Sequence, residues 1–305
     1  MGYYSSLLQN GYLTLFLFHG VIPVTFYSPL RNYNRKHITD RYFEDVIEDI
    51  RISGTPLHFS DAINYIQRHK PLPPNAFVVT FDDGFQNNVD FALPILEKYE
   101  VPTIIYVTTN FCAEQRSSWI DIIECALESL DVVDIPYSAL YPFIQGTYRT
   151  IKEKRFFLDS IRHEVKSNPE IDPLIFADYF VNATDSFKLS ANSPVLDRKI
   201  TPQVLSQLVN NPLVEIGGHS HTHRILGFLS PEEQEHEISS SIELIKNWTN
   251  RDVFHYSYPE GTFNSYNQTT IDILKSNGIF TCVTTNQGNN SFETDLFRLK
   301  RYTVT

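Results

Sequence analysis

The stretch that most constrains this chain is Phe-Val-Val-Thr-Phe-Asp-Asp-Gly, from Phe77 to Gly84. Its apolar and β-branched run is typical of a strand in a parallel sheet, which is apolar on both faces. The two carboxylates at its end, Asp82 and Asp83, repel each other and lose hydration unless something compensates. A divalent cation that binds one of them and leaves the other ionised is a common compensation. Because Gly84 also permits a sharp turn, the sequence predicts a functional site at the end of this strand.

Partners for these carboxylates are expected in His219-Ser220-His221-Thr222-His223, which follows a predicted strand ending in two glycines. His219 and His223 are four residues apart, which would place both imidazoles on one face of a helical turn, whereas His221 would point elsewhere. Two histidines and one carboxylate form a common site for a catalytic divalent metal, with positions open for water and substrate. A surface turn that happens to be rich in histidine is the weaker alternative.

Short apolar strands alternate with amphipathic helices along most of the chain, which predicts right-handed βαβ units in a parallel sheet. Strands are expected at 12–18, 57–59, 77–81, 103–107, 213–218, 254–258, 280–284 and 296–304. This pattern favours a (β/α) barrel with its site at the carboxyl ends of the strands. Between about 111 and 196 the alternation breaks, with helices expected at 119–130 and 152–165. We therefore predict one domain over 1–305 that carries a partly helical insertion.

Composition excludes some partners and suggests a compartment. The net charge of -11 and the pI near 5.3 argue against nucleic acid or an anionic membrane as the main partner. Three cysteines without metal or redox spacing suit buried thiols in a reducing compartment. The first residues lack the features of a signal peptide, and the apolar run at 12–18 is too short to span a bilayer. We predict a cytoplasmic protein without a membrane span, and the sequence leaves its oligomeric state open.

The carboxylate motif at 80–84 and the histidine motif at 219–223 resemble those of a known protein family. Thr80-Phe81-Asp82-Asp83-Gly84 and His219-Ser220-x-x-His223 resemble the first two motifs of the polysaccharide deacetylases that share the NodB homology domain. Further segments are similar to other parts of such enzymes, namely 18–21, 101–107, 258–261 and 283–301. The resemblance covers nearly the whole chain outside the insertion, and the two motifs together, in this order, are specific.

The resemblance implies a distorted (β/α) barrel of about seven strands and the metal-dependent hydrolysis of an N-acetyl group on a sugar. By position, Asp83, His219 and His223 would hold one divalent metal ion, most often Zn²⁺, with Co²⁺, Ni²⁺ or Mn²⁺ as alternatives. Asp82 would be the general base that takes a proton from metal-bound water, which then attacks the amide carbonyl. A backbone N–H of Tyr258 or a neighbour would stabilise the oxyanion.

The third motif departs from the family pattern. Many members have an arginine that tethers the catalytic aspartate where this chain has Ser257, and a tyrosine where it has Glu260. We expect Arg301 or Arg298 to replace the tether, because both lie at the end of the final predicted strand. The histidine that acts as general acid in many members is not evident, since no histidine follows His255.

Other residues are candidates for the substrate pocket. His19, at the end of the first strand, would line the pocket or serve as a hydrogen-bonded core histidine. Tyr258, Pro259 and Glu260 belong to the third motif and are expected at the pocket. Glu260, His19 and metal-bound water are the candidates for protonating the leaving amine. Trp119 would stack on a sugar face or anchor the packing of the insertion.

The sequence thus predicts a metal-dependent deacetylase that acts on an N-acylated sugar in surface polysaccharide or glycan-precursor metabolism. The cytoplasmic prediction favours a nucleotide-sugar or a lipid-linked glycan as substrate over a finished polymer. An O-deacetylase or deformylase on the same scaffold is one alternative. A carbohydrate-binding protein that keeps the metal triad without catalysis is another, favoured by the altered third motif and the missing acid. The intact Asp82 favours an enzyme.

Overall fold

The computed structural model describes residues 2–184, 186 and 195–305. The chain divides into two compact units, which are described separately here. The main unit contains Met1–Val24, Lys36–Arg116 and Lys199–Thr305, and the second unit contains Thr25–Arg35 and Ser117–Arg198. The segment expected as an insertion thus belongs mostly to the second unit. The loop Thr25–Arg35 joins that unit too, which no local sequence pattern indicated.

The main unit is built on a parallel sheet, in which the described residues form eight strands. The strands are β1 (Thr14–Phe18), β4 (Thr55–Pro56), β5 (Ala76–Phe81), β6 (Thr103–Val107), β9 (Val214–Gly218), β10 (His255–Ser257), β11 (Thr281–Val283) and β12 (Tyr302–Thr303). Their order is β11-β10-β9-β6-β5-β1-β12, with β4 beside the start of β5. An isolated parallel bridge joins Val283 of β11 to Leu299, which lies three residues before β12. This confirms the predicted distorted (β/α) barrel.

The central strand β5 is buried on both faces, as its sequence predicted. Phe77, Val79 and Phe81 belong to the core cluster that also contains residues of the surrounding helices. Ala76 and Val78 belong to another cluster, which includes residues of α2. Because neighbouring side chains of a strand point to opposite faces, one run of six residues supplies both layers.

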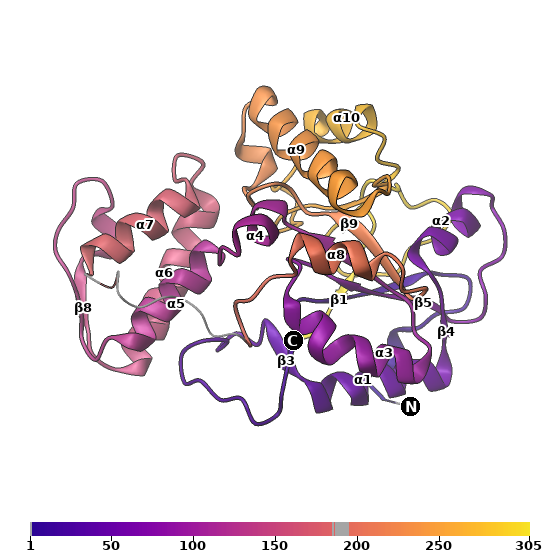
Figure 1. Cartoon of the computed structure of the whole chain (residues 1–305), viewed down its shortest axis with the longest axis horizontal. Coiled ribbons are helices and arrows are strands. Elements are labelled where there is room, and N and C mark those ends of the chain that lie inside the picture. The colour runs from indigo at the N-terminus through magenta and orange to yellow at the C-terminus, as the bar shows by residue number, and fades with distance from the viewer. Residues whose placement is uncertain (1, 185, 187–194) are drawn as a thin grey trace. The chain divides into compact units, whose positions relative to one another are not determined.

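Helices surround this sheet (Figure 1). They are α1 (Asp40–Ser53), α2 (Phe59–Gln67), α3 (Leu93–Tyr99), α4 (Thr109–Glu114), α8 (Pro202–Leu208), α9 (Pro231–Thr249) and α10 (Gln268–Ser276). Local capping explains where several helices begin. The Thr39 side chain accepts from the Tyr42 N–H at the start of α1, and Ser230 and Glu233 form a capping box at the start of α9. Helices α9 and α10 lie side by side, joined by a hydrogen bond between Thr270 and Gln234.

Some predicted elements differ from those observed. The strand expected at 57–59 is β4, two residues earlier, and Phe59 already begins α2. The reason is tertiary, because the Glu215 carboxylate of β9 accepts from the backbone N–H groups of Phe59 (2.6 Å) and Ser60 (3.2 Å). These bonds satisfy N–H groups at the start of the helix that have no partner within it. Short segments add a parallel pair, β2 (Gly20–Ile22) with β3 (His37–Thr39), and a π-helical turn, η2 (Asn88–Ala92).

The second unit is largely helical and has its own core. Its helices are α5 (Trp119–Ser129), α6 (Ile151–Ser167) and α7 (Pro173–Ala183), and an antiparallel pair is formed by β7 (Val133–Ile135) and β8 (Gly146–Tyr148). Phe157, Phe176 and Phe180 are buried at the centre of this core. Helix α7 lies outside the two helices expected for this segment, at 119–130 and 152–165. Across the described parts of both units, no helix is long and apolar enough to cross a membrane.

Candidate metal centre

Polar side chains converge where the central strands of the main unit end. Asp82 and Asp83 follow β5, His219 follows β9, and Ser257 ends β10. Arg301 precedes β12, at the amino end of that strand, and its long side chain reaches Asp82. The carboxyl ends of parallel strands meet at one edge of the sheet, so residues far apart in sequence come together there.

Asp83, His219 and His223 form the group that can hold a metal ion. Their ligand atoms all lie within 4.8 Å of one another. Asp83 Oδ1 is 3.4 Å from Nε2 of His219 and 3.3 Å from Nε2 of His223. This oxygen is buried and makes no hydrogen bond of good geometry to the described residues, so a cation between the three groups would satisfy it. One carboxylate oxygen and two imidazole nitrogens suit zinc and similar transition ions.

The backbone geometry that brings the two histidines together differs from the expected helical turn. Residues 219–223 form a bend, in which Ser220 (φ 62°) and His223 (φ 64°) have left-handed backbone conformations. The Ser220 hydroxyl accepts from the N–H of His223 at 2.9 Å and holds this bend. Asp83 is also left-handed, at φ 72°. A left-handed conformation costs a residue other than glycine about 1–3 kcal/mol of folding free energy, and residues in this conformation cluster at functional sites.

The backbone carbonyl of Ser257 orients His219. Nδ1 of the buried His219 lies 2.8 Å from this carbonyl oxygen. A carbonyl only accepts hydrogen bonds, so Nδ1 carries a proton, and Nε2 is the ring nitrogen that faces Asp83. This is the tautomer that a metal ligand requires. His221 points away, as predicted, and its Nδ1 lies 2.9 Å from the Thr109 hydroxyl.

Asp82 is held by a buried arginine. Arg301 donates from both terminal nitrogens, at 2.8 Å to Oδ1 and 2.7 Å to Oδ2 of Asp82. The Ser257 hydroxyl donates to Oδ2 at 3.0 Å. Of the two arginines expected near this aspartate, Arg301 makes the contact, whereas Arg298 pairs with Asp295. Arg301 is fully buried, so this ion pair is shielded from solvent.

The electrostatics of the site keep both carboxylates ionised. Burial by itself raises the pKa of Asp82, but the charge and hydrogen bonds of Arg301 outweigh it and lower that pKa below its usual value. Burial likewise raises the pKa of Asp83, and the contacts with His219 and His223 outweigh it and hold that pKa well below its usual range. Burial lowers the pKa of His19, against the opposing effect of the two carboxylates, and favours its neutral form.

His19 lies opposite Asp82 in the sheet. Phe18 pairs with Phe81 in the register of β1 and β5, so the next residues of the two strands, His19 and Asp82, are neighbours. Nδ1 of His19 is buried and makes no hydrogen bond to the described residues, unlike a satisfied core histidine. The carbonyl of His19 accepts from the Asn88 side chain at 2.7 Å, which fixes the backbone here.

The third-motif residues occupy varied positions. The side chain of Tyr258 is buried, and its hydroxyl donates to the Phe297 carbonyl at 3.1 Å, so it faces the core. The N–H of Tyr258 makes a long bond of 3.4 Å to the Val283 carbonyl. Pro259, next along the chain, has no N–H to offer an oxyanion. Glu260 is half-buried, with a left-handed backbone (φ 63°) that is held by the Thr285 hydroxyl.

Trp119 belongs to the second unit and packs in its core. It is 7% exposed, and its ring meets that of Phe176 edge to face. Of the two roles expected for this residue, the structure therefore shows the packing role. A side chain so deeply buried has no free face for a sugar to stack on.

Glu237 is a residue of the site that sequence reasoning missed. It lies on α9, is buried, and accepts from the backbone N–H groups of His221 (3.0 Å) and Thr222 (2.8 Å). The Thr222 hydroxyl also donates to it. Glu237 thus braces the bend between the two metal-ligand candidates. In the sequence it is one of several glutamates on a helix, and only its place beside the apolar Ile238 signalled burial.

Comparison with known proteins yields one family and several similar folds. The model of the polysaccharide deacetylase family matches residues 69–138 and 156–281. No curated protein matches the chain. Similar solved structures include the deacetylase PplD of Streptococcus pyogenes in complex with acetate, with 16% identity, a TM-score of 0.63, and coverage of 97% of this chain and 93% of that chain.

Two further structures have the same level of similarity. IcaB from Ammonifex degensii has 16% identity and a TM-score of 0.60, with 98% of this chain and 94% of that chain covered. The deacetylase domain of BpsB from Bordetella bronchiseptica has 16% identity and a TM-score of 0.57, with 97% of each chain covered. At these identities the likeness establishes the fold.

Proposed function

The chain belongs to the polysaccharide deacetylase family, and we propose that it removes the acetyl group from an N-acetylated sugar with the help of one divalent metal ion. Members of this family are hydrolases that act on the N-acetyl amide bonds of sugars. The observation that supports the proposal is the cluster of Asp83, His219 and His223 around a buried carboxylate oxygen, beside a second carboxylate held by Arg301.

The residues of the cluster fit a transition-metal ion. Asp83, His219 and His223 would be the ligands, and Zn²⁺ suits this donor set best, with Co²⁺, Ni²⁺ or Mn²⁺ as alternatives. When bound, such an ion lowers the pKa of a water molecule to near neutrality and polarises the acetyl carbonyl. Three protein ligands leave positions open for both.

Asp82 would take the proton of the attacking water. Its Oδ2 accepts two hydrogen bonds, from Arg301 and Ser257, whereas its Oδ1 accepts one, from Arg301. A carboxylate oxygen has two lone pairs, so Oδ1 retains one that can accept a proton. The arginine keeps this carboxylate ionised and fixed in orientation, as a general base requires.

Of the candidates for protonating the leaving amine, His19 lies beside Asp82, and because burial lowers its pKa it has to take up a proton during the reaction before it can act as an acid. It lies opposite Asp82 and has a buried ring nitrogen that is not hydrogen-bonded to the described residues. The half-buried Glu260 is the other side-chain candidate. We propose His19 rather than Glu260 as the residue that protonates the leaving amine.

Metal content and acyl release test the proposed function. We expect about one metal ion per chain, and acetate release from some N-acetylated sugar in a panel of nucleotide-sugars, lipid-linked glycans and oligosaccharides. Asp83→Ala should lose both the metal and the activity, because the ion then has two ligands instead of three. Asp45→Ala, which removes an exposed carboxylate of α1, is the matched control and should change neither.

Each other outcome favours a different function. Acetate released only from O-acetylated sugars, or formate released from N-formylated ones, would favour an O-deacetylase or a deformylase. Metal bound without release of any acyl group would favour a non-catalytic carbohydrate-binding protein. The cytoplasmic location, and with it a nucleotide-linked or lipid-linked substrate, stays a prediction from the sequence. Fractionation of the native cells tests the location.

Glu237 should support metal binding without touching the ion. We expect Glu237→Ala to lower the metal affinity by about 10–100-fold, because the bend that places His219 and His223 loses three hydrogen bonds. Glu237→Gln, which keeps one acceptor oxygen, should recover part of the affinity. Titration with Zn²⁺ in competition with a chromogenic chelator measures it. Glu243→Ala, an exposed position on the same helix, is the control. Equal affinities for all variants would show that the bend does not need this brace.

A further inference from the structure

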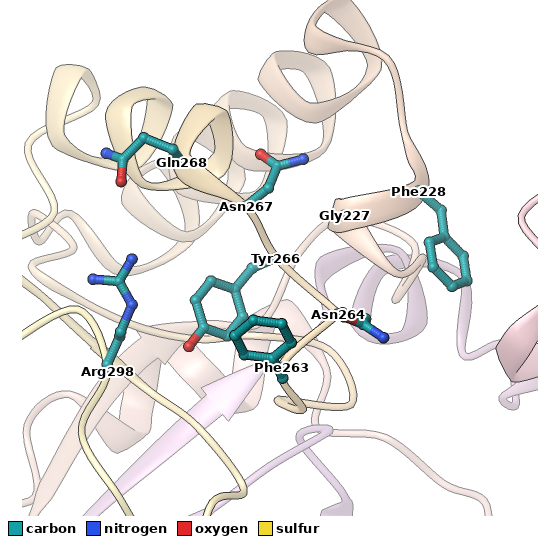
Figure 2. Close-up of a pocket in the computed structure, with 8 residues that line it drawn as sticks. All are labelled: Gly227, Phe228, Phe263, Asn264, Tyr266, Asn267, Gln268 and Arg298. Atoms are coloured by element: carbon teal, nitrogen blue, oxygen red, sulfur yellow. The ribbon is translucent and has the colours of Figure 1, made fainter.

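A pocket and a turn of the main unit lie near strand ends but outside the group of metal-ligand candidates. The pocket, of about 490 Å³, lies between the loops that follow β9, β10 and β11, with Phe263 and Tyr266 in the middle of its walls (Figure 2). Among the described residues, no hydrogen bond, ion pair or ring contact joins its lining to those candidates. The turn follows Asp82 and Asp83 and contacts His19, so it bears directly on the candidate site.

Two consecutive asparagines in this turn, Asn87 and Asn88, hold the chain just beyond β1. The Asn88 side chain donates to the His19 carbonyl at 2.7 Å, and the Asn87 side-chain oxygen accepts from the Val21 N–H at 3.2 Å. The two hydrogen bonds therefore lie on either side of Gly20. Both asparagines are buried, and a hydrogen bond in such surroundings is stronger than in water.

The asparagine pair belongs to the same segment as the two carboxylates. Asp83 and Gly84 have left-handed backbones (φ 72° and 65°), which turn the chain sharply after β5. Asn88 then begins the π-helical turn η2, a rare form that occurs often at functional sites. Because β1 and β5 are neighbours in the sheet, this turn reaches the residues that follow β1. The stretch 82–88 thus supplies both the carboxylates and the hold on His19.

The backbone beside His19 needs this hold because the next residue is glycine. A Cβ at Gly20 would lie 1.8 Å from Nδ1 of His37 and 2.8 Å from Oδ1 of Asn87, so the position requires glycine. Glycine has more backbone freedom than any other residue, and this freedom loosens the chain next to His19. The asparagine pair restricts it with one hydrogen bond on each side.

The ring of His19 depends on its backbone for its place beside Asp82. Its Nδ1 is buried and makes no hydrogen bond to the described residues, so the ring lacks the partner that orients many imidazoles. A general acid must lie within hydrogen-bond reach of the atom that it protonates. The bond from Asn88 to the His19 carbonyl is the contact through which the turn can satisfy that requirement.

We propose that Asn88 is a positioning residue for the proton transfer to the leaving amine, and that it acts by holding His19 within reach of the amine nitrogen. The inference rests on the proposed function, in which His19 protonates that nitrogen. As water adds to the acetyl carbon, one of its protons passes to Asp82 and on to the neighbouring His19. The C–N bond then breaks and its electron pair stays on nitrogen, which takes the proton from His19. Acetic acid and the free amine are formed.

The leaving group distinguishes this role from a general loss of structure. Zinc-loaded Asn88→Leu keeps the size of the side chain and loses its donor. Its kcat for acetate release from an N-acetylated sugar should fall about 10²-fold with KM near that of wild type, because a displacement of about 1 Å costs that much. Hydrolysis of p-nitrophenyl acetate should stay near the wild-type rate, since p-nitrophenolate leaves without a proton.

A second variant and a control accompany Asn88→Leu. Asn88→Asp also keeps the size of the side chain and turns an acceptor towards the His19 carbonyl, so it should show the same selective loss and serves if Asn88→Leu does not fold. Asn64→Leu makes the same change at an exposed position on α2 and should behave like wild type on both substrates.

The place of His19 can be measured without turnover. The probe is the set of histidine Cε1–H signals in the NMR spectrum of the zinc-loaded protein, in which the His19 signal is the one lost in His19→Gln. We expect the His19 signal to shift in Asn88→Leu. The signals of His219 and His223 should stay in place, because the hydrogen bonds that orient these residues do not involve Asn88.

The outcomes separate this inference from the proposed function. Equal loss of amide and ester hydrolysis in both Asn88 variants would overturn the positioning role, as would wild-type activity on the sugar in both. If wild type releases no acetate from any N-acetylated sugar, the proposed function fails. A shifted His19 signal in Asn88→Leu would then still support the hold of Asn88 on His19, and an unchanged signal would overturn it.

Discussion

Replacing Asp82 by asparagine is expected to lower kcat for acetate release by about 10²–10⁴-fold while the metal content stays at the wild-type level. An amide is not basic enough to take the proton of the attacking water. The metal stays because its three ligand candidates are Asp83, His219 and His223, and Asp82 is not among them. Steady-state rates and metal analysis on the same preparations measure both quantities.

The same substitution separates an enzyme from a binding protein. A carbohydrate-binding protein would keep its sugar affinity in Asp82→Asn and show no turnover to lose. Asp45→Asn, at an exposed position on α1, controls for the loss of one negative charge. Unchanged turnover in Asp82→Asn would contradict the assignment of Asp82 as the base. Loss of the metal together with activity would instead show that Asp82 is needed to build the metal centre.

Arg301→Ala is expected to cost about 3–5 kcal/mol of the free energy of unfolding and to reduce activity sharply. The substitution leaves the Asp82 carboxylate buried without its cation, and also removes hydrogen bonds to Thr284 and Ser257. Asp82 then becomes easier to protonate, because burial raises its pKa and the opposing charge is gone. Denaturant unfolding measures the stability, and acetate release measures the activity.

Two further variants identify the cause of the Arg301 effect. The double variant Asp82→Leu with Arg301→Met has no buried charge at this position and should recover most of the stability but none of the activity. Arg298→Ala should behave like wild type, because Arg298 pairs with Asp295 at the surface. If Arg301→Ala keeps both stability and activity, the carboxylate does not need this arginine.

Local sequence patterns predicted the parallel strands and many of the helices. Strand β5 was recognisable because its fully apolar run fits a sheet that is covered on both faces. Helix α9 was recognisable because its cap and its apolar stripe are encoded within a few residues. Helices α4, α7 and α8 were missed, and the expected final strand at 296–304 is reduced to Tyr302–Thr303. Short elements depend on neighbours that a local pattern does not contain.

Some residues of the candidate site were recognisable from the local sequence, whereas others depend on partners far away in the chain. The pairs Asp82-Asp83 and His219-x-x-x-His223 stood out because carboxylates and imidazoles at strand ends demand a compensating partner. Ser257 stood out only as a departure from the family pattern, although its hydroxyl and carbonyl contact Asp82 and His219. Residues whose role depends on a distant partner leave little local signal.

By itself, then, the sequence determined the strand–helix alternation, the carboxylate and histidine motifs and, through them, the family. The tertiary structure decided which arginine meets Asp82, because Arg301 and Arg298 are equivalent by sequence position and differ only in burial and contacts. It also decided the left-handed bend that joins His219 to His223, the brace from Glu237, and the burial of Trp119. Hydrogen bonds and burial between segments far apart in the chain exist only once the strands have paired, so no local pattern encodes them.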